Sequence, residues 1–392
     1  MALLLFAAGW GANHFSTLLV VYRKSLGLSP AALGILFGAY ALGLVPGLLL
    51  AGRASDRWGR RALVVPFSLV AMAASGLLCF GTRGFGVLLA GRLLYGMGMG
   101  SVMSPGSVWV QELSPPGLGA RRATLALSAG FGLGPLVSGL LAELLPGPMV
   151  TPYLVHLAVM AAALERLRLV PETVSRASGR RASTTAGLVP AAAPGSSGAS
   201  PRLAEMAVLL ELVPAAPWAF GFAAATLAIL PGLMRPLVAY PVIYSGLVIV
   251  TTLFVGVAVQ PFVKRVGRHA DLLGLGAGAA GIWMGAQAAA MASPGLVFAA
   301  SALTGAGYGL VMTGGLVEVG ERVPRHARGT AVGAYYVLTY VGFALPFVHA
   351  RWAARAGDAA TLRVTAAAAV ASLVVRAVVK ARRPGRSQAP GL

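Results

Sequence analysis

Four polar residues interrupt long apolar stretches of this sequence and are its candidates for chemistry: Asn13, His14, Arg92 and His156. Histidine gains and loses a proton near neutral pH, so His14 and His156 are candidates for carrying a proton. Arg92 stays charged at physiological pH and needs compensating partners in apolar surroundings. The residue types therefore indicate proton binding. Two simpler interpretations stay open: that His14 only donates a hydrogen bond, and that Arg92 extends to a polar surface.

The residue sets that would indicate an enzyme or a metal site are missing from the sequence. It has no Gly-rich phosphate loop, no nucleophile elbow and no HExxH motif. Its single cysteine, Cys79, excludes an intramolecular disulfide. The five histidines lack metal-ligand spacing: His14, His156, His269, His326 and His349. We therefore expect no enzymatic activity, no cofactor and no bound metal.

The composition of the chain is that of a membrane protein. Of its 392 residues, 57% are hydrophobic and 11% are charged, whereas soluble domains carry about 25% charged residues. The mean hydropathy is +0.79. The apolar runs are long, rich in Ala and Leu, and lack the alternation of strands, so they predict an all-α membrane protein.

Apolar runs bounded by Gly, Pro and charged residues predict twelve membrane-spanning helices. A helix that crosses the hydrocarbon core of about 30 Å needs about 20 residues. The first six are expected near residues 2–22, 31–52, 62–81, 84–109, 123–145 and 150–170. The second six are expected near residues 215–234, 237–261, 270–291, 294–317, 329–349 and 359–379. Pro231, Arg235 and Pro236 interrupt the end of the seventh.

Lysine and arginine residues are concentrated in alternate connections between these spans. With the N-terminus inside the cell, 23 of the 31 lie on the cytoplasmic side, 7 lie outside, and Arg92 lies within a span. This bias predicts that both termini are cytoplasmic. The net charge of +20 is divided among short clusters, so we expect contact with anionic lipids at the cytoplasmic face and none with nucleic acid. The 28 arginines against 3 lysines favour a bacterial cell-membrane protein.

The chain divides into two apolar halves joined by a polar linker. The expected parts are a first bundle (1–171), a linker (172–214), a second bundle (215–380) and a basic tail (381–392). Residues 172–202 are rich in Ser, Gly, Pro, Ala and Arg, which is typical of flexible linkers. Apolar residues at helical spacing from Leu203 to Val213 predict either an amphipathic helix at the inner membrane surface or an early start of the seventh span. The apolar N-terminal run lacks a basic region before it and is interpreted as a membrane helix, with a cytoplasmic segment upstream of Met1 left open.

The two halves are similar to each other at an offset of 208 to 209 residues. Segment 52–61 aligns with segment 260–269. Further aligned pairs are Gly96 with Gly305, Gly98 with Gly307, Gly100 with Gly309, Glu112 with Glu321 and Pro115 with Pro324. Both copies begin on the same side of the membrane, so the repeat is parallel. Such repeats place a substrate site at their interface near the middle of the membrane.

The segment Gly52-Arg-Ala-Ser-Asp56-Arg57-Trp58-Gly59-Arg60-Arg61 resembles the G-x-x-x-D-R-x-G-R-R signature of the major facilitator superfamily of secondary transporters. We place it in the loop after the second span. The resemblance implies an all-α membrane fold of two pseudo-symmetric six-helix bundles. It also implies a latch for the outward-facing state, formed by Gly52, Asp56, Arg57, Gly59, Arg60, Arg61 and Glu112. The alternative is that the arginines only fix topology. The second copy, with Lys264 in place of the acid, is expected to be a weaker latch.

The segment Arg92-Leu-Leu-Tyr95-Gly96 is similar to the R-x-x-x-G motif of the same family. The resemblance implies that Arg92 tunes a partner that binds protons. Proton-coupled exporters of the family usually carry an Asp or Glu in the first or fourth span. Here the first span offers Asn13 and His14 in its place, and His156 in the sixth span is a weaker candidate.

The fifth span contains Gly130-Phe-Gly-Leu-Gly134-Pro135-Leu-Val-Ser138-Gly139, which is similar to the antiporter motif G-x-x-x-G-P-x-x-G-G of the family. Ser138 departs from the motif but is still small. Gly130 and Gly134 share one helix face and allow another helix to approach closely, and Pro135 is expected to kink the span. Helix packing without any role in export is the alternative explanation.

Aromatic and amide side chains along the spans are candidates for contact with a hydrophobic substrate: Trp10, Tyr40, Tyr95, Gln287, Tyr335 and Tyr336. Each of them is also common in the core or at the interface of a membrane protein. We expect proton-driven efflux of a small hydrophobic compound by alternating access of the two bundles. The alternatives are a metabolite uptake symporter or uniporter of the same fold and a non-transporting membrane receptor or scaffold.

Overall fold

The computed structural model describes residues 1–115, 118–173, 201–323 and 328–382, and most of them are helical. Long apolar runs form helices because a backbone surrounded by lipid has to satisfy its hydrogen bonds internally. Most of the linker (174–200) and the end of the tail (383–392) lie outside the described residues. The division of the chain at these two segments therefore stays a prediction.

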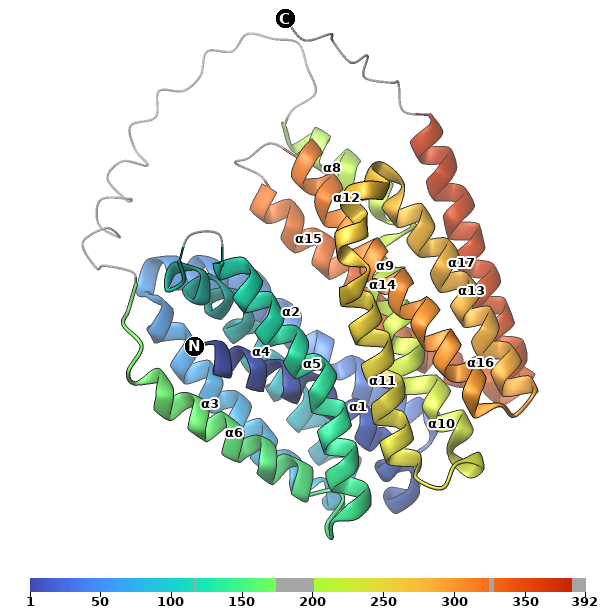
Figure 1. Cartoon of the computed structure of the whole chain (residues 1–392), viewed down its shortest axis with the longest axis horizontal. Helices are drawn as coiled ribbons and strands as arrows, with labels where there is room; N and C mark the ends of the chain where they lie inside the picture. The colour runs from blue at the N-terminus through green and yellow to red at the C-terminus, as the bar shows by residue number, and fades with distance from the viewer. Residues whose placement is uncertain (116–117, 174–200, 324–327, 383–392) are drawn as a thin grey trace, which may run out of the picture.

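Six helices form the first bundle (Figure 1). They are α1 (Ala2–Leu26), α2 (Pro30–Trp58), α3 (Arg60–Leu78), α4 (Phe85–Glu112), α5 (Gly119–Leu144) and α6 (Thr151–Leu167), with a 3-10 turn, η1 (Gly81–Arg83), before α4. Local residues set the helix ends. Gly27 ends α1 in the left-handed conformation, with a φ of 62°. Ser29 caps α2 by accepting a hydrogen bond from the N–H of Ala32 (3.2 Å).

The second bundle is more often interrupted and is preceded by a separate helix, α8 (Pro201–Leu212). Its first span consists of α9 (Ala216–Ala224), the π-helical η2 (Ala225–Ile229), α10 (Leu230–Met234) and η3 (Arg235–Leu237). The next is α11 (Pro241–Ala258), followed by the short η4 (Gln260–Phe262), α12 (Val263–Val266) and η5 (Gly267–His269). The remaining spans are α13 (Ala270–Ala290), α14 (Pro294–Arg322), the continuous run of α15 (Arg328–Tyr340), η6 (Val341–Ala344) and α16 (Leu345–Ala356), and finally α17 (Asp358–Ala381).

The number of spans agrees with the expectation of twelve. Ten segments of the described chain are long and apolar enough to cross a membrane. One of them, Pro241–Ala290, contains two separate helices, α11 and α13. Helix α6 has 17 residues and falls just short of the length required for that count. With α6 included and α11 and α13 counted separately, the described chain has twelve spans in two bundles of six, and the predicted fold is confirmed.

The turn after the second span is shorter than the sequence predicts. Segment 52–61 is expected in a loop, whereas α2 continues to Trp58 and α3 begins at Arg60. The apolar run ends near Ala51, but a helix need not end where it leaves the hydrocarbon, and Arg57 beyond that point is exposed. Gly59 makes the turn with a φ of 102°, which a residue with a side chain rarely adopts.

Two helix pairs make the most extensive contacts between the bundles: α5 packs on α11, and α2 packs on α16. The approach of α5 to α11 is so close that a Cβ added to Gly139 would lie 2.9 Å from the carbonyl oxygen of Val242. A Cβ added to Gly34 of α2 would lie 2.6 Å from the backbone nitrogen of Phe347 in α16. Glu143, near the end of α5, accepts hydrogen bonds from the first turn of α11, from the N–H groups of Val242 (2.6 Å) and Ile243 (3.4 Å). These contacts lie toward the same end of the molecule, which we call the closed end.

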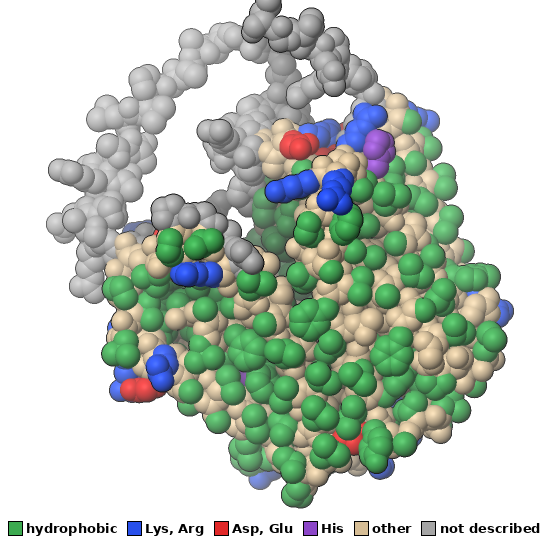
Figure 2. Space-filling model, viewed as in Figure 1, with side chains coloured by type: hydrophobic (Ala, Val, Ile, Leu, Met, Phe, Trp, Pro, Cys, Tyr) green, Lys and Arg blue, Asp and Glu red, His purple; other side chains and the backbone are tan. Residues whose placement is uncertain are grey.

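The other end carries Arg60, Arg268 and Arg322, and we call it the basic end. The bundles diverge toward this end (Figure 1). Figure 2 shows a recess between them there, with lysine and arginine side chains on its rim. The two bundles are therefore held together at one end and separated at the other, as a molecule that exposes a central site to one side at a time would be.

Candidate transport site

Arg92 lies two turns into α4, and its side chain points into the first bundle rather than to the surface. It is 2% exposed. Its guanidinium donates to three backbone carbonyl oxygens, of Leu36 (3.2 Å) and Phe37 (3.4 Å) in α2 and of Ala12 (3.5 Å) in α1. It also lies over the ring of Tyr40, at 4.7 Å, which supports a cation electrostatically. Carbonyl dipoles and aromatic faces thus take the place of a carboxylate counter-ion.

His14 of α1 is fully buried, and neither of its ring nitrogens has a hydrogen-bond partner among the described residues. Its ring packs edge-on against Tyr153 (4.8 Å between centroids) and His156 (4.9 Å). A buried polar group without a partner costs about 1–3 kcal/mol. Such a group calls for an explanation, and an exchangeable proton is one that histidine chemistry supplies.

His156 of α6 lies beside His14 but is fully hydrogen-bonded. Its Nε2 lies 3.1 Å from the carbonyl oxygen of Ala7 and 3.3 Å from the hydroxyl of Tyr95. A carbonyl oxygen can only accept, so Nε2 carries the hydrogen, and Nδ1 accepts from the hydroxyl of Ser75 at 3.1 Å. His156 is thereby fixed in one neutral form and holds α1, α3, α4 and α6 together, whereas His14 is not fixed in this way.

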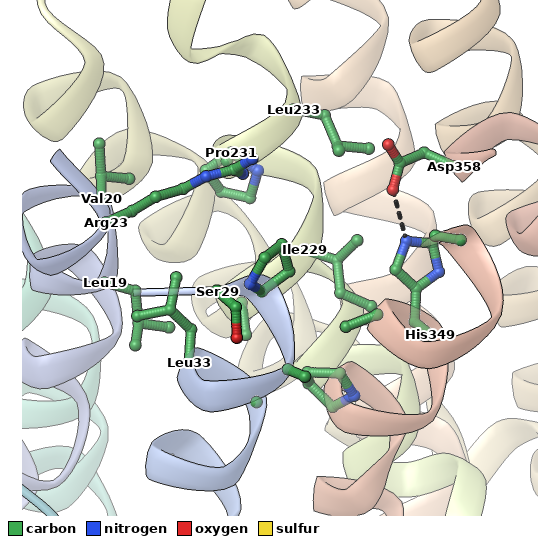
Figure 3. A pocket seen from close by; sticks show the side chains of 18 of the residues that line it. Leu19, Val20, Arg23, Ser29, Leu33, Ile229, Pro231, Leu233, His349 and Asp358 are labelled. Atoms are coloured by element: carbon green, nitrogen blue, oxygen red, sulfur yellow. Dashed lines mark hydrogen bonds and ion pairs between the residues drawn. The ribbon is translucent and has the colours of Figure 1, made fainter. Parts of the chain in front are cut away.

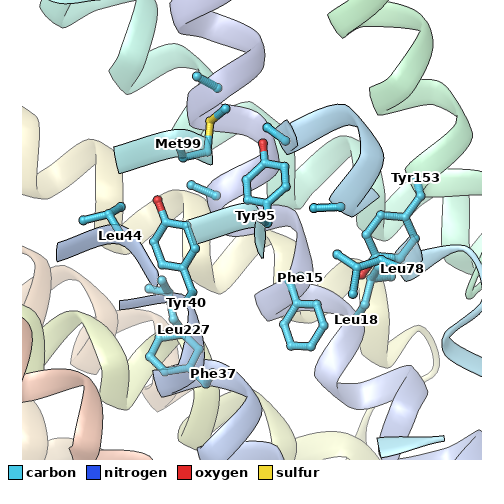
Figure 4. Close-up of a cluster of buried hydrophobic side chains, with 14 of the residues drawn as sticks. Phe15, Leu18, Phe37, Tyr40, Leu44, Leu78, Tyr95, Met99, Tyr153 and Leu227 are labelled. Carbon is cyan, nitrogen blue, oxygen red and sulfur yellow. The ribbon is translucent and has the colours of Figure 1, made fainter. Parts of the chain in front are cut away.

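These groups form one polar assembly in the core of the first bundle, which we call the Arg92 cluster: Arg92, His14, His156, Tyr40, Tyr95 and Tyr153. Figure 4 shows Tyr40, Tyr95 and Tyr153 within the surrounding apolar core. The hydroxyl of Tyr153 lies 2.5 Å from that of Tyr22. Sequence reasoning missed Tyr153, Ser75 and Tyr22, and the only local signal is that Tyr153 precedes His156 by three residues, on the same face of α6.

Other predicted residues lie outside this cluster. Asn13 is partly buried on the adjacent face of α1. Trp10 donates its indole N–H to the hydroxyl of Ser138 in α5, at 3.1 Å. Tyr335 is buried and donates to the carbonyl oxygen of Val311, which ties α15 to α14. The last two candidates, Tyr336 and Gln287, are partly buried in α15 and in the last two turns of α13.

The glycine motif of α5 lies against α1. A Cβ added to Gly130 would lie 2.1 Å from the carbonyl oxygen of Phe6, and one added to Gly134 would lie 2.7 Å from the Cα of Trp10. Pro135 lies within the continuous helix, and its carbonyl oxygen accepts a hydrogen bond from Thr17 (3.1 Å). Since the Gly139 side of α5 meets α11, this helix is packed tightly between the first bundle and the second.

At the basic end of the first bundle, Arg60 is the centre of a group that we call the Arg60 cluster. Its guanidinium donates to Glu112 (2.9 Å), the expected partner, and to Ser55 (2.7 Å). Glu172, after α6, accepts hydrogen bonds from the backbone N–H groups of Arg60 (3.1 Å) and Arg61 (2.8 Å) at the start of α3. A carboxylate at this position is stabilised by the helix dipole. These contacts tie together α2, α3, α4 and the end of α6.

The other residues of the predicted latch are less fully described. Arg57 is exposed. The side chain of Asp56 and the surroundings of Gly52 lie outside the described part of the structure. The latch role of the segment therefore stays a prediction.

The second bundle has a different ionic group at the same end, which sequence reasoning missed. Arg376 of α17 is fully buried, and its guanidinium binds Asp271 of α13 (2.7 Å) and Glu318 of α14. Lys380 also binds Asp271. Arg322 adds bonds to Glu318 (2.7 Å) and to Glu211 of α8 (2.5 Å). We call this the Arg376 cluster; its members are too far apart in sequence for a local pattern to reveal it.

The comparisons with known proteins agree on the fold. The family model described as Major Facilitator Superfamily matches residues 1–384. Among solved structures, the nucleoside transporter NupG superposes with a TM-score of 0.74 over 97% of this chain and 98% of its own, at 11% identity. A POT family transporter in complex with 5-aminolevulinic acid superposes with a TM-score of 0.75 over 97% and 95%, at 10% identity. At such low identity these two matches show the fold alone.

Curated relatives are similar over part of their length. The probable metabolite transport protein CsbC of Bacillus subtilis is 27% identical over 161 residues, which are 40% of this chain and 33% of CsbC. The quinolone resistance protein NorA of Staphylococcus aureus is 30% identical over 128 residues, which are 32% of this chain and 33% of NorA. The aligned region thus spans about a third of either relative.

Proposed function

The chain belongs to the Major Facilitator Superfamily, and on that premise we propose that it exports small, mostly apolar compounds in exchange for protons. Membership of the family makes it a multi-pass membrane transporter of small molecules rather than an enzyme. The observation that carries the proposal is His14, buried with both ring nitrogens unbonded in the same cluster as the buried charge of Arg92.

The proposed orientation places the basic end in the cytoplasm. Of the 31 lysines and arginines, 23 belong to connections and termini that the repeat places at this end. Positively charged connections are retained on the cytoplasmic side during insertion. Both termini are then cytoplasmic, and the basic rim faces anionic lipid headgroups.

With this orientation, the described conformation is the inward-facing one. The bundles meet at the closed end through α5 with α11 and α2 with α16, and the recess lies at the basic end (Figure 2).

Proton coupling follows from the charges of the Arg92 cluster. Protonated His14 would be a second positive charge in an apolar site that already contains Arg92, and like charges disfavour each other there. No described carboxylate pairs with either residue. A proton on His14 therefore stabilises a conformation that opens the site to water relative to the described one. A ligand that binds two conformations unequally is what shifts their equilibrium.

The direction and the substrate rest on the relatives and on the α5 motif. NorA is named for quinolone resistance, and the Gly130–Gly139 segment resembles the antiporter motif. The similarity to CsbC, named as a probable metabolite transport protein, supports a second candidate function, the uptake of a metabolite. These two functions differ in the direction of flux.

The test is transport in membrane vesicles of both orientations. We expect inverted vesicles to accumulate a fluorescent, mostly apolar compound when a pH gradient is imposed, and an uncoupler to abolish the accumulation. Vesicles containing His14→Ala would be the comparison, with His269→Ala as a matched control at the exposed basic end. Accumulation only in right-side-out vesicles would favour the uptake function. Accumulation that the uncoupler does not change would contradict proton coupling.

A further inference from the structure

A cavity of about 660 Å³ lies between the two bundles at the closed end (Figure 3). Its walls come from the end of α1, the start of α2, the region from η2 to η3, and α16, with Ser245 of α11 and Asp358 of α17. The inner part is apolar and includes Leu19, Leu33, Leu227 and Ile229. Pockets for drug-sized ligands measure roughly 300–1,000 Å³, so the size suits a small organic molecule. We call this cavity the vestibule.

Three polar atoms in the wall of the vestibule are buried without a hydrogen-bond partner among the described residues: Ser245 Oγ, Arg235 Nη1 and His349 Nδ1. Ser245 is 1% exposed and His349 is 4% exposed. Buried polar atoms are nearly always paired, and leaving one unpaired is costly. Three such atoms belong to residues that line one cavity, and a ligand bound there would supply their partners once these side chains turn toward it.

The charge of the vestibule indicates which ligand. Its described lining contains four arginines: Arg23, Arg235, Arg351 and Arg355. The acidic residue in the same lining is Asp358, which is already bound by Nε2 of His349 at 3.0 Å (Figure 3). The lining therefore has an excess of positive charge next to an apolar interior. A planar guanidinium with a free N–H group suits a carboxylate in particular.

We propose that the vestibule binds a small organic carboxylate with an apolar body. Arg235 and the hydroxyl of Ser245 bind the carboxylate, and the body lies on Leu227 and Ile229. His349 Nδ1 faces a polar substituent of the body. The proposal deepens the proposed function by naming a substrate class, and it rests on that function only for the side of the membrane from which the carboxylate arrives.

The experiment measures equilibrium binding to the full-length protein in nanodiscs of zwitterionic lipid, by calorimetry, without any gradient. The probes are naphthoate and its neutral isostere naphthamide. We expect naphthoate to bind about tenfold more tightly than naphthamide, which is the size of one charge-assisted hydrogen bond.

Arg235→Gln is expected to weaken naphthoate binding about tenfold and to leave naphthamide binding unchanged. Ser245→Ala, which keeps the charge and removes the hydroxyl, is expected to give a smaller loss. The matched control is Arg363→Gln, an exposed arginine of α17 outside the vestibule, and it is expected to bind as the unmodified protein does.

Three outcomes would overturn the proposal. The first is equal affinity for naphthoate and naphthamide, and the second is unchanged naphthoate binding in both Arg235→Gln and Ser245→Ala. The third is loss of naphthoate binding when anionic lipid is added to the nanodiscs, which would assign the arginines to lipid headgroups. Because no pH gradient is involved, a failure here leaves proton-coupled export untouched, and a failure of the vesicle experiment leaves this site untouched.

Discussion

Arg92 of α4 and Ser301 of α14 occupy equivalent positions of the internal repeat, each four residues before an aligned glycine. Both are buried. The hydroxyl of Ser301 donates a hydrogen bond to the carbonyl oxygen of Val297 in the same helix (2.6 Å). Arg92 instead donates to carbonyl oxygens of two other helices. The same fold thus forms with or without a charge at this position. The cost of a charge in a membrane is the reason to seek the role of Arg92 in transport.

At the basic end it is the second bundle that has the more deeply buried charge. The second bundle contains the fully buried Arg376, held by carboxylates from α13 and α14. In the first bundle the ion pair at the same end is Arg60 with Glu112, whose carboxylate side chain is 33% exposed. The first bundle therefore has a fully enclosed charge within a span, at Arg92, whereas the second has its most deeply buried charge at the basic end, at Arg376. We infer that the first bundle senses protons and that the second is anchored at its end.

The largest expected effect is that of Arg92→Ala. Removing the charge removes the repulsion that makes protonated His14 unfavourable in the described conformation, so transport is expected to fall to the level of vesicles without the protein, while the amount inserted in the membrane is unchanged. Ser301→Ala is the matched substitution in the other bundle and is expected to transport normally. Full activity of Arg92→Ala under a pH gradient, or an equal loss in Ser301→Ala, would contradict the assignment of coupling to the first bundle.

Arg376→Ala is expected to have the largest effect on stability. It leaves Asp271 and Glu318 with less compensation in a buried site, at a cost of about 3–5 kcal/mol in the free energy of unfolding. Arg60→Ala in the first bundle is expected to cost less, about 1.5–3 kcal/mol, because water reaches its partner. Unfolding in mixed micelles measures both. Equal costs would show that the two clusters are anchored alike.

Gly130→Ala is expected to cost about 1–3 kcal/mol, because its Cβ would collide with backbone atoms of α1. The second bundle has a similarly close contact, Gly342 against Pro217, where an added Cβ would lie 2.1 Å from a carbonyl oxygen, and Gly342→Ala is expected to cost a similar amount. Gly76→Ala is the control, since nothing lies within 4 Å of an added Cβ there. Thermal unfolding of the three variants would show whether both bundles depend on this close packing. An unchanged stability of Gly130→Ala would contradict the prediction for the first bundle.

The smallest expected effect concerns the contact between the bundles. Glu143→Gln removes a negative charge from the N-terminus of α11, which is worth about 0.3–1 kcal/mol. The closed end is then expected to open more often, seen as a longer-distance population between spin labels on the ends of α5 and α11. Glu165→Gln removes an exposed carboxylate whose ion-pair partner among the described residues is Arg168, and serves as the control. The same distance distribution in Glu143→Gln and the unmodified protein would exclude this contact as a support of the closed end.

Much of the fold follows from the sequence because its signals are local. Span lengths, the order of the helices and the repeat depend on runs of about 20 apolar residues and on glycine positions. The helix ends were less predictable where polar residues continue a helix beyond the hydrocarbon, as α2 does up to Trp58. The pairing of Arg60 with Glu112 was predictable from the family resemblance, whereas the involvement of Glu172 in the same cluster was not.

By itself the sequence determined that the chain is a twelve-helix membrane transporter and that Arg92 and His14 are its unusual buried groups. Only the tertiary structure decided that these two belong to one cluster, that His156 is fully bonded beside them, and that Arg376 holds the second bundle at its end. It also brought Arg235, Ser245 and His349 to one cavity. The physical reason is that hydrophobicity acts along each span, whereas hydrogen bonds and ion pairs between spans depend on helix rotation and crossing, which distant residues set together.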